Sequence, residues 1–597
     1  MTAEVALRPA PEPGRGTPVS GTARADRRWP RPSRFDLAVG VAYLLASVYL
    51  AMHVLADPVR RVQSHNVNDD VFFQWALAHG ARVLTHGVDP FFTRQLNVPA
   101  GVNMIANTSI LGISLPLAPV TLLFGSGASY ALLLVLAPWA TSTVWYRVLS
   151  RHLTGPGAGA VLGGAFCGFA PGMVAQANGH PNIVAQFLVP LLVWRALRLR
   201  EPGRAIRNGV ALGLVTVWQA FINEEILFST ALAMAIFAAC YGLLRRDEVR
   251  AAVRPAARGL AVAALVAGAL LAYPLLVQFF GAQTYHGLSA GIERFGADVT
   301  SFPAFSSQSL GGSGFTRGHF AQNAAEENAF FGWPLLILIG VIIFWLRTVV
   351  AVRALGVVAL VFALLSLGPQ LFIHGRHTHI PGPYALVNHL PVFDTVVSTR
   401  LALVIIPVFG ILLAYGFRRI GAELPGRSRL IWYALLAAAL VPLVPRPLPA
   451  IDTRLAPSFV ASGEWRRYVA PGHSMVTVPV ASSRYVQPML WSARTGLDLP
   501  LAGGYFLGPS SDAKGTAIFG APARPTSTLL DTVYRTGQLQ DVTDRQRADA
   551  RADLRYWRAS IVVLQDGTWH DSLLWDTVNE LLGTTGRHIG DAWVWTV

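Results

Sequence analysis

Apolar runs of about 20 residues recur along the first three quarters of this 597-residue sequence. An α-helix needs about 20 such residues to cross a hydrocarbon core of about 30 Å. Only 14% of the residues are charged, whereas soluble proteins carry roughly 25%. The sequence therefore disfavours a soluble enzyme and predicts a polytopic α-helical membrane protein.

The run at 110–124 is also apolar, but it has only 15 residues, a central proline and no basic residue at its far end. We expect it to lie along the outer face of the membrane rather than to cross it. Without this run, about eleven transmembrane helices are predicted, at residues 37–56, 126–146, 155–178, 182–199, 208–222, 226–244, 259–280, 329–346, 354–373, 400–417 and 429–445.

The distribution of arginine tests this topology, because Lys514 is the only lysine in a chain with a formal net charge of +15. With eleven spans and a cytoplasmic N-terminus, the inner loops hold 18 Arg against four acidic residues, and the outer loops hold 8 Arg and 11 acidic residues. Cytoplasmic loops are enriched in basic residues. We therefore expect a multi-pass plasma-membrane protein whose net charge reflects topology, with no nucleic-acid partner.

The composition divides the chain into three predicted parts. Residues 1–34 are rich in Pro, Gly and Arg and read as a disordered, basic cytoplasmic tail. Residues 35–446 hold the predicted spans. Residues 447–597 are charged and mixed, and parity places them outside as an extracytoplasmic α/β domain. Its predicted strands are 474–480 and 560–564, and its predicted helices are 544–557 and 569–582.

Ionisable residues gather in the predicted outer loops. Among them, the adjacent pair Asp69 and Asp70 is the strongest candidate for a catalytic role. It precedes an amphipathic stretch whose Phe72, Phe73, Trp75 and Leu77 suit the membrane interface. A carboxylate beside the bilayer surface could take the proton of an attacking hydroxyl as a general base. The alternative is that Asn68 or Asp69 only caps the N-terminus of this helix.

These features together resemble the GT-C superfamily, integral-membrane glycosyltransferases that use polyprenyl-phosphate-linked sugars. The resemblance covers the architecture of residues 35–446 and is most specific at the sequence NVNDD, residues 66–70. It implies transfer of one sugar, hexosyl or pentosyl, to a glycan, lipid or protein acceptor hydroxyl outside the membrane. It further implies that Asp70, or Asp69, is the catalytic base. A single displacement would invert the anomeric carbon, and cell-envelope glycan assembly is the expected setting.

Other outer residues are candidates for binding the substrates. Arg400, Arg376 and His377 are candidates for the donor phosphate, although an arginine at a span end also fits simple snorkelling to the interface. Three candidates for binding the rest of the substrate are His180, Glu224 and Glu225. The alternative for His180 is that it only stabilises a turn. The alternative for Glu224 and Glu225 is that they only pair with other groups at the end of a helix. Oxygen-rich loops could hold Mg²⁺ or Mn²⁺, but no ligand spacing identifies a metal site.

Two other classes of protein fit the same composition. A transporter or flippase of a lipid-linked or charged solute would tend to show inverted repeats and polar residues at mid-membrane. The sequence shows no repeat, an odd number of predicted spans and polar groups on the outer side. The third possibility is a non-catalytic assembly or sensor protein whose outer domain binds glycan. Loss of turnover on changing one carboxylate separates the enzyme from both.

Overall fold

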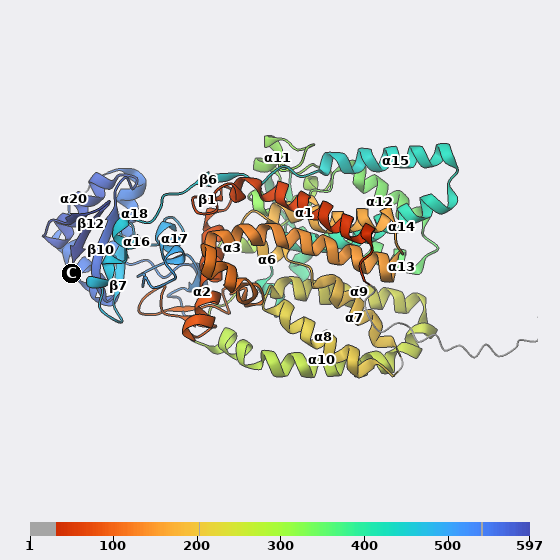
Figure 1. The fold of residues 1–597 in the computed structure, drawn as a ribbon, viewed down its shortest axis with the longest axis horizontal. Helices are drawn as coiled ribbons and strands as arrows, with labels where there is room; N and C mark the ends of the chain where they lie inside the picture. The colour runs from red at the N-terminus through yellow and green to blue at the C-terminus, as the bar shows by residue number, and fades with distance from the viewer. Residues whose placement is uncertain (1–30, 202, 539–540) are drawn as a thin grey trace, which may run out of the picture.

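The computed structural model describes residues 31–597, apart from 202 and 539–540. Helices run along the long axis of an elongated body, and a sheet-bearing C-terminal region lies at one end of it (Figure 1). Helix α1 (Arg34–Leu55) begins at the opposite end. The predicted tail, 1–34, lies outside the described residues except for its last four.

A capping box starts α1 at the boundary of the described chain. The Ser33 hydroxyl accepts the backbone N–H of Asp36, and the Asp36 carboxylate accepts the backbone N–H of Ser33. Tyr146 and Arg151 donate to the same carboxylate from the end of the second apolar helix, at 2.6 and 2.7 Å. These bonds satisfy the open N–H groups of the first turn and fix α1 against its neighbour.

Seven helical segments in the described part of the chain are long and apolar enough to cross a membrane. They are α1, α3 with η1 (Leu111–Leu153), α4 with α5 (Ala158–Gln176), α6 to η2 (Pro181–Arg200), α9 (Glu224–Leu244), α10 (Arg246–Phe280) and η8 with α14 (Ser398–Ile420, with α14 itself Ile405–Glu423).

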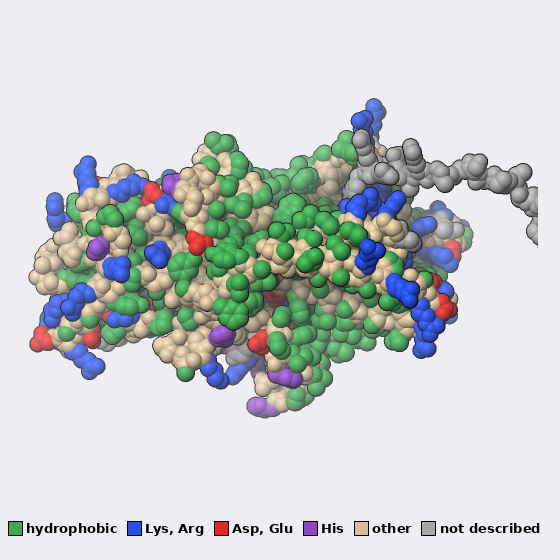
Figure 2. Space-filling view, turned by 90° about the horizontal axis from the view of Figure 1, so that it is seen from below, with side chains coloured by type: hydrophobic (Ala, Val, Ile, Leu, Met, Phe, Trp, Pro, Cys, Tyr) green, Lys and Arg blue, Asp and Glu red, His purple; other side chains and the backbone are tan. Residues whose placement is uncertain are grey.

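Shorter helices stand at the remaining predicted spans: α8 (Ala205–Ala220), α12 (Trp333–Trp345), α13 (Val350–Ser366) and α15 (Gly426–Leu440). The molecule is thus a multi-pass membrane protein, and the count of eleven spans stays a prediction. Figure 2 shows a broad hydrophobic surface around the middle of the body, with Lys and Arg side chains gathered toward its two ends.

Helix α3 (Leu111–Val148) contains a break at Gly125, whose φ of 84° and ψ of 168° are not helical. Glycine adopts a positive φ at little cost because it has no Cβ. The break separates the run that the sequence assigned to the outer face from the apolar run that follows it. Its orientation along the membrane stays a prediction.

Helix α2 (Val67–His86) packs between α3 and α17 (Gln487–Arg494). The expectation that its four apolar side chains face the membrane interface is wrong, because they are all buried: Phe72, Phe73, Trp75 and Leu77. The C-terminal region covers α2 through α17, and strand β1 (Arg61–Gln63) pairs antiparallel with β6 (Ala450–Asp452) beside it.

Short elements occupy the loops between the helices on the side of the C-terminal region. They are β2 (Phe92–Thr93), β3 (Val102–Asn103), η3 (Ile292–Arg294), η4 (Val299–Ser301), α11 (Gly314–His319), η5 (Ala324–Glu326), β4 (Gln370–Ile373), β5 (Arg376–Pro381), η6 (Pro383–Leu386), η7 (Phe393–Thr395) and η9 (Val441–Leu443).

The C-terminal region is built on a four-stranded sheet in the order β11-β12-β10-β7, in which only β7 and β10 run parallel. The strands are β7 (Ser474–Thr477), β10 (Ala559–Gln565), β11 (Arg587–Ile589) and β12 (Ala592–Thr596). The helices are α16 (Ser458–Ala461), η10 (Glu464–Arg467), α17, α18 (Pro525–Thr536), α19 (Asp544–Tyr556) and α20 (Asp571–Leu582). The four predicted elements of this region are therefore confirmed, as β7, β10, α19 and α20.

Two hydrophobic cores meet at this sheet. One contains α18, α19 and α20 against side chains such as Val476 and Leu564. The other continues from Met475 and Ile561 through Trp491 of α17 into the membrane helices. The division of the chain at residue 447 stays a prediction, since a single core joins the two sides.

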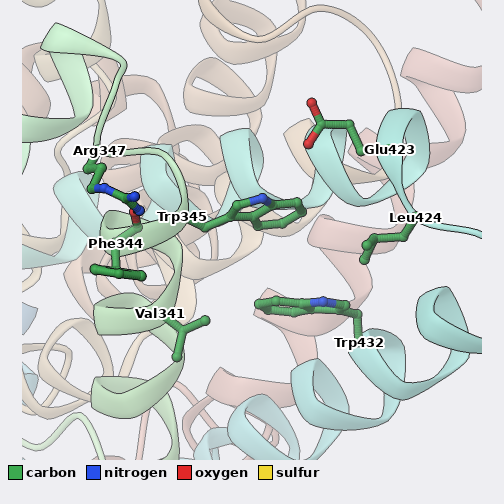
Figure 3. A pocket seen from close by; sticks show the side chains of 7 residues that line it. All are labelled: Val341, Phe344, Trp345, Arg347, Glu423, Leu424 and Trp432. Atoms are coloured by element: carbon green, nitrogen blue, oxygen red, sulfur yellow. The ribbon is translucent and has the colours of Figure 1, made fainter.

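An apolar hollow of about 460 Å³ lies at the end of the body away from the C-terminal region, between α12, α14 and α15 (Figure 3). Trp345 and Trp432 stack there with ring centroids 5.4 Å apart. Its polar lining is limited to Arg347 and Glu423. This hollow is therefore separate from the polar side chains that meet beside the C-terminal region.

Candidate active site

Six polar side chains from distant parts of the chain meet beside the C-terminal region, and we refer to them as the acidic cluster. They are Asp69 of α2, His180 at the start of α6, Glu225 of α9, Glu326 of η5, Arg400 of η8, and Tyr505 just before strand β8 (Leu507–Pro509).

Both carboxylate oxygens of Asp69 accept hydrogen bonds. Tyr505 donates its hydroxyl to Oδ1 at 2.8 Å. Asn66, the N-cap of α2, donates to Oδ2 at 2.5 Å, and Nε2 of His180 lies 3.0 Å from the same oxygen. Burial alone would raise the pKa of Asp69, but His180 and these hydrogen bonds hold it below 3.8. The side chain is 20% exposed, so solvent reaches an ionised carboxylate.

Asp70 has different surroundings although it is the next residue. Its side chain is fully buried. One oxygen accepts the backbone N–H of Gln63 at 2.8 Å, and the other accepts the side-chain amide of Gln74 at 2.7 Å. Burial raises the pKa of Asp70 to about 7. Since successive helical residues point about 100° apart, only Asp69 of the pair faces the acidic cluster.

The turn that carries His180 is held by the side chain of Gln63. Its amide oxygen accepts the backbone N–H of Gly179 at 2.9 Å, and its amide nitrogen donates to the Ala177 carbonyl at 2.6 Å. Gly179 has a φ of 102°, and a Cβ there would lie 2.7 Å from the side-chain nitrogen of Asn66. Glycine therefore allows the turn to approach the cap of α2 closely enough for His180 to reach Asp69.

Arg400 is occupied by two glutamates. Its Nε and Nη2 donate to one oxygen of Glu326 at 3.0 and 2.6 Å, and its Nη1 donates to Glu225 at 3.2 Å. The second oxygen of Glu326 accepts from Asn328 at 2.8 Å and from Gln176 at 3.3 Å. Burial opposes ionisation, yet the charge of Arg400 and these bonds lower the pKa of Glu326.

The charges of the cluster do not balance. Three carboxylates face one guanidinium and one imidazole, so with all three carboxylates ionised the cluster stays anionic even when His180 is protonated. Glu225 and Arg400 are each 19% exposed, and His180 is 14% exposed. Nδ1 of His180 and Oε1 of Glu225 are buried with no hydrogen-bond partner in the described part of the chain. Unpaired buried polar atoms are costly, which is typical of a site that a polar ligand completes.

The remaining predicted site residues lie outside this cluster. Glu224 accepts a hydrogen bond from Gln278 of α10 at 2.8 Å. Arg376 and His377 are exposed on the β4–β5 hairpin. The hairpin is fixed by Asp298, whose carboxylate accepts the backbone N–H groups of its turn, for example that of Gly375 at 2.7 Å. The structure thus brings together four predicted residues, namely Asp69, His180, Glu225 and Arg400.

The donor set does not fit Mg²⁺ or Mn²⁺. Among residues 31–597 without 202 and 539–540, no group of three or more His, Cys, Asp and Glu side chains is arranged to hold a metal ion. Glu225 and Glu326 both bond the guanidinium of Arg400, which takes the position that a metal ion would need between them. No step described below uses a metal.

Comparison with known proteins places this site in a wider context. The sequence matches the family described as "Domain of unknown function (DUF6311)" over residues 68–442. No curated protein matches it. The arabinofuranosyltransferase AftD from Mycobacteria, solved by cryo-EM, superposes with a TM-score of 0.52 at 13% identity, over 94% of this chain and 41% of that chain.

Two further solved structures align at lower scores. ArnT from Cupriavidus metallidurans, bound to undecaprenyl phosphate, gives a TM-score of 0.46 at 12% identity, over 94% of this chain and 97% of that one. The apo oligosaccharyltransferase of Archaeoglobus fulgidus gives 0.46 at 12% identity, over 89% and 69%. The similarity to AftD is one of fold alone, and this chain spans less than half the length of that protein.

Proposed function

This chain is a member of the DUF6311 family, and from its GT-C fold and acidic cluster we propose that it is a membrane glycosyltransferase. It moves one sugar, hexosyl or pentosyl, from a polyprenyl-phosphate donor to an acceptor hydroxyl on the outer face of the plasma membrane. The observation that carries the proposal is the ionised, solvent-reached carboxylate of Asp69, which His180 and Asn66 hold in place.

Asp69 acts as the general base in this proposal. An acceptor hydroxyl donates to its Oδ1 and transfers the proton as the hydroxyl oxygen bonds to the anomeric carbon. The bond from that carbon to the phosphate oxygen breaks, and its electron pair leaves with the polyprenyl phosphate. A single displacement of this kind inverts the anomeric carbon. Asp70 is the less suitable base because Gln63 and Gln74 occupy both of its oxygens inside the protein.

The other members of the cluster orient groups rather than exchange protons. Nε2 of His180 holds Oδ2 of Asp69, and the hydroxyl of Tyr505 donates to Oδ1, the oxygen that faces the acceptor in this proposal. Arg400 positions Glu225 and Glu326 through three hydrogen bonds. A sugar hydroxyl would supply the missing partner of Oε1 in Glu225.

For the donor phosphate we favour Arg376 and His377 over Arg400. The guanidinium of Arg400 already faces two carboxylates, and these would repel a phosphate. In the β4–β5 hairpin, Arg376 and His377 are exposed to solvent, and Asp298 anchors its turn. Within the described part of the chain Arg376 pairs with no carboxylate, so its charge is available to an anionic leaving group.

The surroundings of the reaction follow from the arginine distribution. We propose that the N-terminus is cytoplasmic and that residues 447–597 form an extracytoplasmic domain beside the site. The acceptor is then a component of cell-envelope glycan, presented as a glycan, lipid or protein. The alternative of a transporter or flippase gains no support from the structures that this chain resembles.

The test is sugar transfer in nanodiscs with a panel of polyprenyl-phosphate sugars and mass-spectrometric detection. We expect Asp69→Asn to lower turnover by roughly 10²- to 10⁴-fold, the usual contribution of a general base, and to leave donor binding unchanged. Asp70→Asn is expected to retain far more activity. Asp394→Asn, an exposed outer-loop carboxylate, is the matched control. Full turnover in folded Asp69→Asn protein would exclude Asp69 as the base.

A further inference from the structure

Both oxygens of the Asp69 carboxylate already accept hydrogen bonds in this structure. Oδ2 is engaged by Asn66 and His180, which lie on the protein side of the site. Oδ1 is engaged by the hydroxyl of Tyr505 at 2.8 Å, from a segment 436 residues further along the chain. A phenol and a sugar hydroxyl are both O–H donors with the same hydrogen-bonding reach. The Tyr505 hydroxyl therefore occupies one of the positions at which Oδ1 could accept a sugar hydroxyl.

Tyr505 is part of an aromatic surface at the edge of the C-terminal region. Its ring stacks on Phe519 with centroids 5.6 Å apart and planes 12° apart, and the edge of Phe72 contacts it at 6.4 Å. Phe519 is 42% exposed. It belongs to strand β9 (Ala517–Phe519), which pairs antiparallel with β8 beside Tyr505. An exposed aromatic ring thus lies next to a hydrogen-bonding carboxylate.

This combination suits one class of acceptor. The C–H face of a sugar ring packs on an aromatic ring, while the hydroxyls at its edge need polar partners placed beside that ring. Phe519 provides the apolar face and Asp69 provides the acceptor of the hydroxyl. An acceptor that is only a lipid or a peptide would not need this pairing.

The backbone around Tyr505 is anchored, which restricts any movement to the side chain. His286 pairs with the β9 strand through its N–H to the Gly515 carbonyl and its carbonyl to the Ala517 N–H, each at 3.0 Å. The side-chain oxygen of Asn107 accepts the N–H of Leu507 at 2.5 Å. A change in χ1 of Tyr505, which swings the whole ring, would move its hydroxyl away from Oδ1 of Asp69.

We propose that the acceptor is a saccharide that packs on Phe519 and whose hydroxyl replaces the Tyr505 hydroxyl on Oδ1 of Asp69. Until the acceptor arrives, the Tyr505 hydroxyl competes with water for that oxygen. The reaction thereby prevented is donor hydrolysis: water gives a proton to Asp69, its oxygen bonds to the anomeric carbon, and the phosphate leaves with the electron pair. This inference rests on the proposed function and adds the acceptor class and its binding site.

The first experiment measures donor hydrolysis without an acceptor. With the donor that the wild type uses in the panel above, we expect Tyr505→Phe to raise hydrolysis roughly tenfold to a hundredfold, the range for losing one hydrogen bond to a charged group. Tyr285→Phe is the matched control, because the Tyr285 hydroxyl donates to the Ala106 carbonyl and not to Asp69. Hydrolysis equal to that of the wild type, together with slower transfer, would mean that Tyr505 only positions Asp69 and would overturn the proposal.

The second experiment separates acceptor binding from chemistry. With methyl glycosides as acceptors, Phe519→Ala is expected to raise the acceptor KM about tenfold at an unchanged kcat, since an aromatic contact of this size is lost. With methanol as the acceptor, which has no ring to stack, KM should not change. Phe315→Ala, at another exposed ring in an outer loop, is the control. An unchanged KM for every glycoside would place the saccharide elsewhere and overturn the proposal.

Failure of this inference can be distinguished from failure of the proposed function. If Asp69→Asn abolishes transfer but Tyr505→Phe and Phe519→Ala behave like wild type, only the inference fails. If no donor is turned over, ¹⁹F NMR of 3-fluorotyrosine at position 505 tests whether a glycoside displaces the Tyr505 hydroxyl from Asp69. Methyl glycosides should then shift the signal toward its position in the Asp69→Asn protein. A signal that no glycoside moves would overturn the inference.

Discussion

At the scale of single residues, the adjacent carboxylates Asp69 and Asp70 show how one helical step separates two chemical roles. Asp69 keeps its charge because donors surround it, whereas burial raises the pKa of Asp70 to about 7. A base works only in its ionised form, so activity is present above its pKa and is lost as the pH falls through it. The two candidates therefore predict different pH profiles.

With Asp69 as the base, we expect kcat/KM for sugar transfer to be flat from about pH 5 to 8 and to fall only below about pH 4. With Asp70 as the base, kcat/KM would instead rise between about pH 6 and 8. The measurement is a pH series of initial rates with saturating donor in nanodiscs. A rising limb centred near pH 7 would contradict the assignment to Asp69, and Asp394→Asn serves as a control for general effects of removing a carboxylate.

The sequence predicted the residue types of the site better than their arrangement. The motif at 66–70 pointed to the pair that includes Asp69 of the acidic cluster, but the choice between its two carboxylates depends on which way each points in the folded helix. Tyr505 was missed because it lies in a region without a recognised motif, 436 residues from its partner. The doublet Gly503-Gly504 before it is the one local signal of a special backbone, since Gly504 has a φ of 157°.

At the scale of elements, Arg400 ties three segments together: it belongs to η8 and bonds Glu225 of α9 and Glu326 of η5. Two carboxylates with restricted access to water depend on this one cation. Removing one partner of a buried ion pair leaves an uncompensated charge, at a cost of about 3–5 kcal/mol.

We therefore expect Arg400→Met to lower the thermal unfolding midpoint in detergent by several degrees. The triple variant Arg400→Met, Glu225→Gln, Glu326→Gln should recover most of that loss, because no charge is then left unpaired. Arg376→Met on the exposed hairpin is the matched control. An unfolding midpoint of the single variant equal to that of wild type would show that water, not Arg400, stabilises the two glutamates.

Hydropathy predicted the helices well, since every expected span overlaps a helix or a run of helices, although the span expected at 354–373 ends in strand β4. It failed at α2, whose apolar face suggested contact with the membrane interface. The face is apolar because the C-terminal region covers it, with Trp491 of α17 and Trp75 of α2 both fully buried. A hydrophobic pattern shows that a surface is buried but does not show what buries it.

At the scale of the whole molecule, the core shared by α2 and α17 implies that the C-terminal region stabilises the site. We expect Trp491→Ala to increase amide hydrogen exchange in α2 about as much as in α17, because elements packed in one core open together. The control is Trp575→Ala in α20, whose helix belongs to the other core. Faster exchange confined to α17 would mean that the two regions unfold independently.

Strand β1 and the carboxylate of Asp69 both have partners that are synthesised much later than they are. Ribosomes add about 5–20 residues per second, and the partner of Arg61 is Asp452, 391 residues further on. The helix that bears Asp69 therefore spends roughly 20–80 s beside the bilayer before β6 is made, and longer before Tyr505 arrives. Until then the nascent chain holds Asp69 without the hydroxyl that bonds its Oδ1. Under the proposed function, the order of synthesis thus makes the carboxylate before the residue that would shield it from water.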